Sequence, residues 1–213
     1  MGARYKDGVT TRILLVRHGE SEWNASGRWQ GWAESALSDL GRTQALEAAQ
    51  AVGAVDAIVC SDLQRAMQTA LIISEAIGVG PVAAEPDLRE RDVGEWTGKT
   101  KDEIEERWPG DLDRWRRGEL LSPPGGEQTE HIVERLERGL RTVATTFAGG
   151  EVLAVSHGGV MRVLERTFGI AQPPPFPNLG GLVVDVHGDR IDVGDRVLLL
   201  DPSTDHVTAP NNL

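Results

Sequence analysis

ILLVRHGES, at residues 13–21, is the stretch that decides the fold of this 213-residue chain. Four apolar residues, Ile13–Val16, are short enough for a buried strand, and they end directly before an arginine, a histidine and a glycine. The same pattern returns at residues 152–159, where VLAV is followed by SHGG. Because the carboxyl ends of parallel strands meet at one edge of a sheet, we expect His18 and His157 to lie close together.

Strands and helices alternate along the rest of the chain. Three further apolar runs have the length of strands, at Ala57–Cys60, Leu182–Val186 and Val197–Leu200. Helical spacing of apolar residues occurs at Ser38–Val52, Asp62–Ile77, Glu127–Phe147 and Val160–Phe168. This alternation predicts an α/β fold, a three-layer α/β/α sandwich with a mostly parallel sheet. A hairpin over Val184–Val193 adds one antiparallel edge strand.

We expect one domain over residues 1–213, with a flexible lead-in at 1–10 and a loose tail at 208–213. Residues 97–126 are charged, carry Trp108 and Trp115, and end in two prolines and two glycines. This segment predicts a helical insertion near the active site that acts as a lid. Residues 171–178 hold four prolines and must be extended.

The composition excludes several classes of protein. With 22 basic and 33 acidic residues, the formal net charge is -11, which argues against a nucleic-acid partner and against a basic membrane-surface protein. The single cysteine, Cys60, excludes an internal disulfide and favours a reducing compartment. No apolar stretch approaches the ~20 residues that a membrane span needs, and the first residues lack a signal peptide. We therefore expect a cytoplasmic protein, either a monomer or a homodimer.

Positive charge gathers near the two histidines. Arg17 precedes His18, and Arg65 follows the run Ala57–Cys60 closely enough to fall in the first turn of the next helix, at the same sheet edge. Two histidines could instead be ligands of a zinc ion. A zinc site needs at least a third ligand, however, and the positive charge of Arg17 would repel a metal ion. Two arginines at one edge favour a phosphoryl group, which guanidinium groups bind with paired hydrogen bonds.

Four segments in this order resemble the motifs of the histidine phosphatase superfamily, in its phosphoglycerate-mutase-like branch. They are LVRHGESEWN, SDLQRAMQTA, LRERDVGEWTG and SHGG, and the resemblance covers residues 12 to about 165. The third segment contains Glu90. The pattern is closest to the small phosphatases of broad specificity.

The resemblance implies a role for each matching residue. His18 would attack phosphorus and form a phosphohistidine, while Glu90 would act first as general acid and then as general base. Arg17, Arg65 and His157 would hold the phosphoryl oxygens. Further phosphate or substrate contacts are implied at Ser21, Asn24, Gln30, Gly31 and Gly158. The substrate would be a small phosphorylated metabolite, and the reaction would need no metal and no organic cofactor.

Two other functions stay open. A phosphoglycerate mutase would transfer the phosphoryl group to a second hydroxyl, but such mutases carry a Glu-Arg-His-Tyr-Gly type segment where this chain has Glu90-Arg91-Asp92-Val93-Gly94. Asp92 would also place negative charge where a second phosphate needs positive charge, which favours a phosphatase. A noncatalytic protein that binds a phosphorylated ligand is the other alternative, but both His18 and Glu90 are present.

Overall fold

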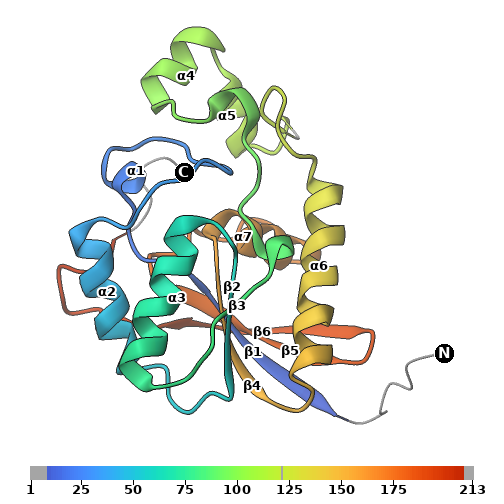
Figure 1. Cartoon of the computed structure of the whole chain (residues 1–213). Coiled ribbons are helices and arrows are strands. Elements are labelled where there is room, and N and C mark those ends of the chain that lie inside the picture. The colour runs from blue at the N-terminus through green and yellow to red at the C-terminus, as the bar shows by residue number, and fades with distance from the viewer. Residues whose placement is uncertain (1–8, 121, 209–213) are drawn as a thin grey trace.

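The computed structural model describes residues 9–120 and 122–208, and within them it contains one six-stranded sheet (Figure 1). The strand order is β3-β2-β4-β1-β5-β6. The strands are β1 (Thr10–Arg17), β2 (Ala57–Cys60), β3 (Ala83–Ala84), β4 (Glu151–Ser156), β5 (Gly180–His187) and β6 (Arg190–Leu198). The first four are parallel to their neighbours in that group, and β5 is antiparallel to both β1 and β6.

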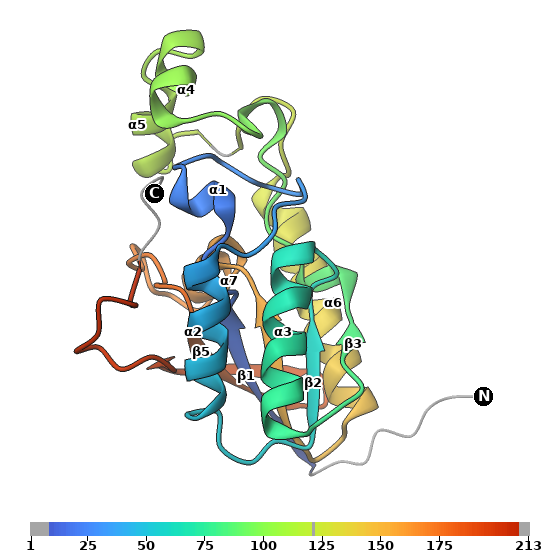
Figure 2. The ribbon, with the colours of Figure 1, turned by 60° about the vertical axis from the view of Figure 1, so that its left-hand side comes forward.

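Helices cover both faces of the sheet, as the predicted sandwich requires (Figures 1 and 2). Helices α2 (Asp39–Ala49) and α3 (Gln64–Ile77) pack on one face, and α6 (Thr129–Thr146) and α7 (Gly158–Thr167) pack on the other. The sheet residues alternate between two buried clusters, one under each helix pair. The predicted fold class is confirmed. The run Val197–Leu200 is the end of β6 rather than a strand of its own, because β6 continues from the hairpin to Leu198.

The pairing of β1 with β4 sets the position of both histidines. The two strands are parallel, and Arg17 lies opposite Ser156. His18 continues the ladder by one bond, since its backbone N–H donates to the Ser156 carbonyl at 3.0 Å. The first residue beyond each strand is therefore a histidine at the same edge of the sheet.

Two glycines allow the backbone after His18 to lie directly against the start of α2. A Cβ atom on Gly19 would lie 2.6 Å from the Gly41 carbonyl oxygen, and one on Gly41 would collide with the backbone of Glu20. The Gly19 N–H also donates to Thr69 Oγ1 of α3 at 3.0 Å. The turn that carries His18 is thus held between α2 and α3, with no room for a larger residue.

The expected insertion contains two short helices, α4 (Lys101–Arg107) and α5 (Asp111–Arg116), preceded by the short 3-10 helices η1 (Pro86–Leu88) and η2 (Gly94–Trp96). It lies beyond the carboxyl ends of the strands, next to α1 (Glu22–Ala25) (Figure 2). The insertion has its own small core, in which Trp96 is fully buried and packs against Trp29 and the half-buried Trp115.

The two ends of the chain are only partly described. Most of the expected lead-in, residues 1–8, and the end of the expected tail, residues 209–213, lie outside the described residues. Thr10 already belongs to β1. Thr208 is not loose, because its backbone carbonyl accepts the Asn178 N–H and its hydroxyl bonds to Asn178 and Gln44. Of the helices in residues 9–120 and 122–208, none has the length and apolar character to cross a membrane.

Candidate active site

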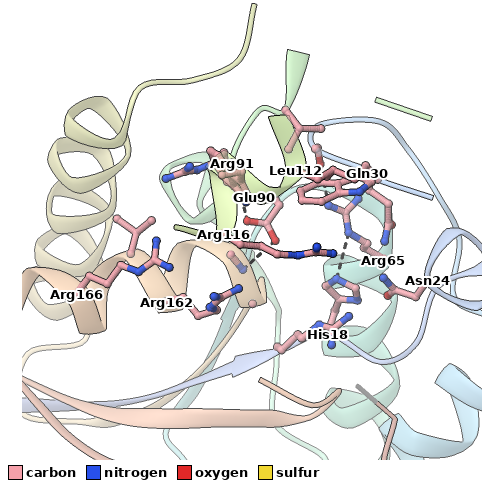
Figure 3. Close-up of a pocket in the computed structure, with 18 residues that line it drawn as sticks. His18, Asn24, Gln30, Arg65, Glu90, Arg91, Leu112, Arg116, Arg162 and Arg166 are labelled. Carbon is pink, nitrogen blue, oxygen red and sulfur yellow. Dashed lines mark hydrogen bonds between the residues drawn. The ribbon is translucent and has the colours of Figure 1, made fainter. Parts of the chain in front are cut away.

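A cavity of about 120 Å³ opens at the carboxyl ends of β1 and β4, below the insertion (Figure 3). Its walls come from the end of β1, from α1 and the loop after it, from the start of α3, from the loop before η2, and from α5 and α7. Several residues that the sequence singled out line it: Arg17, His18, Asn24, Gln30, Gly31, Arg65, Glu90 and Gly158. The sheet edge has therefore gathered residues separated by up to 141 positions in the sequence into one small space.

The hydrogen bonds of His18 determine which ring nitrogen is available. Nδ1 lies 2.6 Å from the carbonyl oxygen of Gly19, which can only accept, so Nδ1 carries the hydrogen. Nε2 then keeps its lone pair in the neutral ring, and it accepts the Nε–H of Arg65 at 3.2 Å. The Asn178 side chain fixes the backbone by donating to the His18 carbonyl at 2.8 Å. The ring is thus oriented with an unprotonated Nε2 at the cavity.

Burial keeps this imidazole neutral. Desolvation lowers the pKa of His18 well below its usual value, and the positive charges of Arg65 and Arg17 lower it further. The His18 side chain is therefore in the form that can act as a nucleophile at neutral pH and for some distance below it.

Arg17 and Arg65 are both buried and both held by carbonyl groups. Arg17 donates to the Phe176 carbonyl at 2.9 Å, so the extended proline-rich segment 171–178 is a support for this side chain. Arg65 donates to the carbonyls of Gly31 and Ala33. Burial lowers the pKa of each to about 10, which still leaves both charged at neutral pH. Neither has a carboxylate ion-pair partner among the described residues, so an anion can bind both.

Glu90 lies across the cavity from His18 (Figure 3). Its Oε1 accepts the Arg91 N–H at 2.8 Å, and its Oε2 accepts the Gly159 N–H in the first turn of α7 at 3.1 Å. A Cβ atom on Gly159 would collide with this carboxylate, so the glycine leaves the space that Glu90 fills. Glu90 is the only carboxylate among the described residues that line the cavity.

Arg135 of α6 holds the loop that carries Glu90. Its guanidinium donates to the carbonyls of Asp87, Arg89 and Glu90 at 2.8–3.0 Å. Glu127 balances its charge through two hydrogen bonds, at 2.7 and 2.9 Å. The two side chains are only 9% and 11% exposed. Trp32 adds a further bond from its indole N–H to the Glu90 carbonyl.

His157 lies behind His18, and the two ring centroids are 5.1 Å apart in an edge arrangement. Its Nε2 lies 2.9 Å from the hydroxyl of Ser61. Its Nδ1 is buried and has no hydrogen-bond partner among the described residues. Burial and the nearby Arg65 lower the pKa of His157 well below its usual value. His157 is fully buried and is not one of the described residues that line the cavity, so the structure places this predicted site residue behind the cavity wall.

A comparison with protein families agrees with this arrangement. The model for the histidine phosphatase superfamily (branch 1) matches residues 13–186, a span that includes both histidines, Arg65 and Glu90. The chain belongs to the histidine phosphatase superfamily.

Relatives of this histidine phosphatase include hydrolases and a mutase. It is 38% identical to a metal-independent phosphoserine phosphatase of Arabidopsis thaliana over 163 residues, 74% of this chain and 68% of the relative. It is 35% identical to a 2,3-bisphosphoglycerate-dependent phosphoglycerate mutase of Parvibaculum lavamentivorans over 163 residues, 71% and 77% of the two chains. The structure of a mycobacterial glucosyl-3-phosphoglycerate phosphatase complexed with VO3 matches with a TM-score of 0.75 at 30% identity, over 85% and 96% of the chains. The predicted family and enzyme class are confirmed.

The remaining residues predicted for the site differ in their placement. Asn24 and Gln30 line the cavity, and Gly31 holds Arg65 through its carbonyl. Gly158 lines the cavity too, and a Cβ atom there would lie 3.2 Å from Arg17 Cδ. Ser21 is buried behind Gln30 and is not one of the described residues that line the cavity. Its hydroxyl donates to Gln30 Oε1 at 2.9 Å, so it holds Gln30 in place.

One argument from the sequence is wrong in this histidine phosphatase. Asp92 was expected to bring negative charge to the site, but within the described chain it is not among the residues that line the cavity. Its carboxylate instead accepts the Gly94 N–H at 2.9 Å and stabilises the turn into η2. The position of Asp92 therefore gives no argument against the binding of a second phosphate, and so none against a mutase.

The sequence analysis did not select several residues that line or support the site. Arg162 and Arg166 of α7 line the cavity, and Ser61, Arg135 and Asn178 support it. One signal for the first pair was present, because Gly158, Arg162 and Arg166 are spaced four apart on one helix and share a face. Residues 9–120 and 122–208 contain no cluster of three or more His, Cys, Asp or Glu side chains that could hold a metal ion.

Replacing Arg135 with methionine should destabilise the protein by roughly 3–5 kcal/mol, because the nearly buried Glu127 would lose its partner. Arg138 provides the control, since it lies one turn further along α6 and pairs with Asp87 while its side chain is 63% exposed. Arg138→Met should cost less than about 1 kcal/mol. Urea unfolding of the two variants measures both values. Equal losses would show that burial of the Arg135 pair is not what stabilises the loop.

His157 should make the protein less stable in mild acid. Below pH ~6.5 the unfolded chain protonates this histidine while the folded protein does not, because its folded pKa is lowered. The free energy of unfolding should therefore fall with pH by up to about 1.4 kcal/mol per pH unit from this residue. In His157→Asn, urea unfolding from pH 7.5 to 5 should show a shallower fall than in the wild type. His131→Asn, at an exposed position, should follow the wild type, and parallel curves for His157→Asn would contradict the assignment.

Proposed function

We propose that the protein is a metal-independent phosphomonoester hydrolase that works through a phosphohistidine on His18, with Glu90 as general acid and base. The observation that carries this proposal is the orientation of His18, whose unprotonated Nε2 faces a cavity lined by Arg17 and Arg65, with Glu90 opposite. A phosphoryl group between the two arginines would place its phosphorus next to Nε2 and its ester oxygen toward Glu90.

In the first step, Nε2 of His18 attacks phosphorus, and the bond from phosphorus to the ester oxygen breaks. Protonated Glu90 gives its proton to that oxygen, so the alcohol leaves neutral. Arg17 and Arg65 stabilise the negative charge that spreads over the equatorial oxygens of the phosphoryl group in the transition state.

In the second step, water replaces the alcohol beside Glu90. The Glu90 carboxylate takes a proton from the water as its oxygen attacks phosphorus, and the bond to His18 Nε2 breaks. Inorganic phosphate leaves, and both side chains return to their starting forms. The protein groups alone account for every proton in the two steps.

His157 is assigned a supporting contact with the phosphoryl group. When the Ser61 hydroxyl donates to Nε2 of His157, the ring hydrogen lies on Nδ1, which has no acceptor among the described protein atoms. A phosphoryl oxygen would satisfy it. Asn24 and Gln30 line the cavity on the side of His18 and Arg65 (Figure 3). The insertion at 97–126 closes over the cavity as a lid in this proposal, and the compartment is the cytoplasm.

The alternative to a phosphatase is a phosphoglycerate mutase, and the positive charge on the far side of the cavity favours it. Arg91, Arg162 and Arg166 give the far side of the cavity positive charge, which a substrate with a second phosphate would use. The relative from Parvibaculum lavamentivorans is named as such a mutase. The two functions differ in whether water or a second hydroxyl receives the phosphoryl group from His18.

Phosphate release from a panel of phosphomonoesters in the presence of EDTA tests the proposal, with conversion of 3-phosphoglycerate to 2-phosphoglycerate measured in parallel. We expect phosphate release without isomerisation, and His18→Ala should abolish it because the nucleophile is gone. His131→Ala, a substitution at an exposed histidine, should keep full activity. Isomerisation faster than release would identify a mutase, and silence in both assays would favour a binding protein. Turnover by His18→Ala would remove His18 from its role.

Glu90→Gln should slow alkyl phosphates by roughly a hundredfold or more, because their alkoxide leaving groups need a proton. The loss on p-nitrophenyl phosphate should be much smaller, since its phenolate leaves readily without one. Steady-state and burst kinetics on both substrates separate phosphorylation of His18 from its hydrolysis. Glu95→Gln, an exposed carboxylate in the same loop, is the control and should change neither rate. An equal loss of the burst rate on both substrates would contradict the general-acid role.

A further inference from the structure

Two buried side-chain amides hold the backbone turn of His18 on the side away from the cavity. Asn178 donates through Nδ2 to the His18 carbonyl at 2.8 Å. Gln44 of α2 accepts the Glu20 N–H through Oε1 at 2.7 Å. Asn178 is 1% exposed and Gln44 is 0% exposed. The two amides therefore bind the turn on either side of Gly19.

The hydroxyl group of Thr208 connects these two amides. It donates to Oδ1 of Asn178 at 2.9 Å, and it accepts a hydrogen from Nε2 of Gln44 at 2.9 Å. Nε2 of Gln44 also donates to the His206 carbonyl at 2.6 Å, and the Thr208 carbonyl accepts the Asn178 N–H at 2.9 Å. The chain after β6 passes beside α2 before it makes these contacts (Figure 2). Residues 206–208 thus lie behind the turn of His18.

The position of the hydroxyl matches what both amides need. A backbone carbonyl only accepts and a backbone N–H only donates, so Nδ2 of Asn178 must face His18 and Oε1 of Gln44 must face the backbone N–H. The oxygen of Asn178 then needs a donor at its other end, and the amino group of Gln44 needs an acceptor. A hydroxyl group supplies both at once, whereas the methyl group of a valine would supply neither.

The peptide group between Gly19 and Glu20 carries this orientation to the imidazole ring. Its carbonyl oxygen lies 2.6 Å from Nδ1 of His18 and accepts the hydrogen on that nitrogen. Its N–H is the group that donates to Gln44. Because a peptide group is planar and its C=O and N–H point in opposite directions, fixing one of them fixes the other. The Gln44 amide therefore determines where the acceptor for Nδ1 lies, and so which way Nε2 faces.

The backbone next to Asn178 has an unfavourable conformation. Leu179 has a φ of +55°, and it is the only residue other than glycine with a positive φ in the described part of the chain. Such a conformation costs free energy and persists where the surrounding structure enforces it. The Leu179 N–H donates to the Arg17 carbonyl at 3.1 Å. Residues 178 and 179 therefore bind the carbonyls of both Arg17 and His18.

We propose that Thr208 is a positioning residue for phosphoryl transfer to His18, and that it acts through Asn178 and Gln44. This inference rests on the proposed function, in which Nε2 of His18 attacks phosphorus in line. Thr208 is not one of the described residues that line the cavity, so its effect does not come from contact with the substrate. A displacement of a reacting atom by about 1 Å can lower a rate by about a hundredfold.

Single-turnover release of p-nitrophenol from p-nitrophenyl phosphate tests this proposal, with the protein in saturating excess. The rate constant then reports phosphorylation of His18 and does not depend on the fraction of protein that is folded, so a purely structural role would leave it unchanged. Thr208→Val keeps the shape of the side chain and should lower this rate constant about tenfold. The protein concentration at half-maximal rate, which reports binding of the ester, should change less than about threefold.

Thr208→Ser restores the hydroxyl group and should recover most of the rate constant. Thr204→Val is the matched control. It removes a hydroxyl group from the same part of the chain, but that group bonds to the nearby Asp201 carbonyl, so the rate constant should stay at the wild-type value. Urea unfolding of each variant checks that it folds.

The outcomes separate the two proposals. An unchanged rate constant in Thr208→Val, or an equal loss in Thr208→Ser, would overturn the positioning role and leave the phosphatase in place. Absence of p-nitrophenol release by the wild type would instead overturn the proposed function and, with it, this inference.

Discussion

The parallel pairing of β1 with β4 is the interaction on which the site depends. Arg17 lies opposite Ser156, so His18 and His157 leave the sheet side by side, and their rings come within 5.1 Å between centroids. A slip of one residue in this register would turn the side chain of Arg17 to the other face of the sheet, away from its present position at the cavity. Gly19 and Gly41 allow this arrangement, because their lack of side chains lets α2 pack against the turn that follows His18.

Electrostatics decide what the cavity can bind. The chain as a whole carries a formal net charge of -11, yet this cavity contains buried arginines and one carboxylate among the described residues. Burial also keeps His18 and His157 neutral. The pair formed by Arg135 and Glu127 fixes the backbone of Glu90 from outside, so the carboxylate is held without an ion pair that would use up its charge. The result is a cavity suited to an anion, in which Glu90 is the one carboxyl group among the described lining residues that can transfer a proton.

The sequence was most informative for charged and reactive residues that lie close to the ends of predicted strands. It predicted the fold class, and it selected Arg17, His18, Arg65 and Glu90, which all line one cavity. It was misleading at Asp92, because a residue next to Glu90 in sequence can point into a turn instead of into the site. It missed Arg162 and Arg166, because two exposed-looking arginines on a helix resemble an ordinary solvated face until the loop with Glu90 is packed beside them.

The sequence by itself determined the family, the order of strands and helices, and the residues available for phosphoryl chemistry, because these follow from local patterns and from motifs at fixed spacing. Only the tertiary structure decided which nitrogen of His18 faces the cavity, that Ser21 supports Gln30 from behind, and that Arg135 holds the loop of Glu90. It also decided that five arginines without carboxylate partners share one cavity: Arg17, Arg65, Arg91, Arg162 and Arg166. The reason is physical, since hydrogen-bond direction and charge balance depend on distances between segments that lie far apart in the chain.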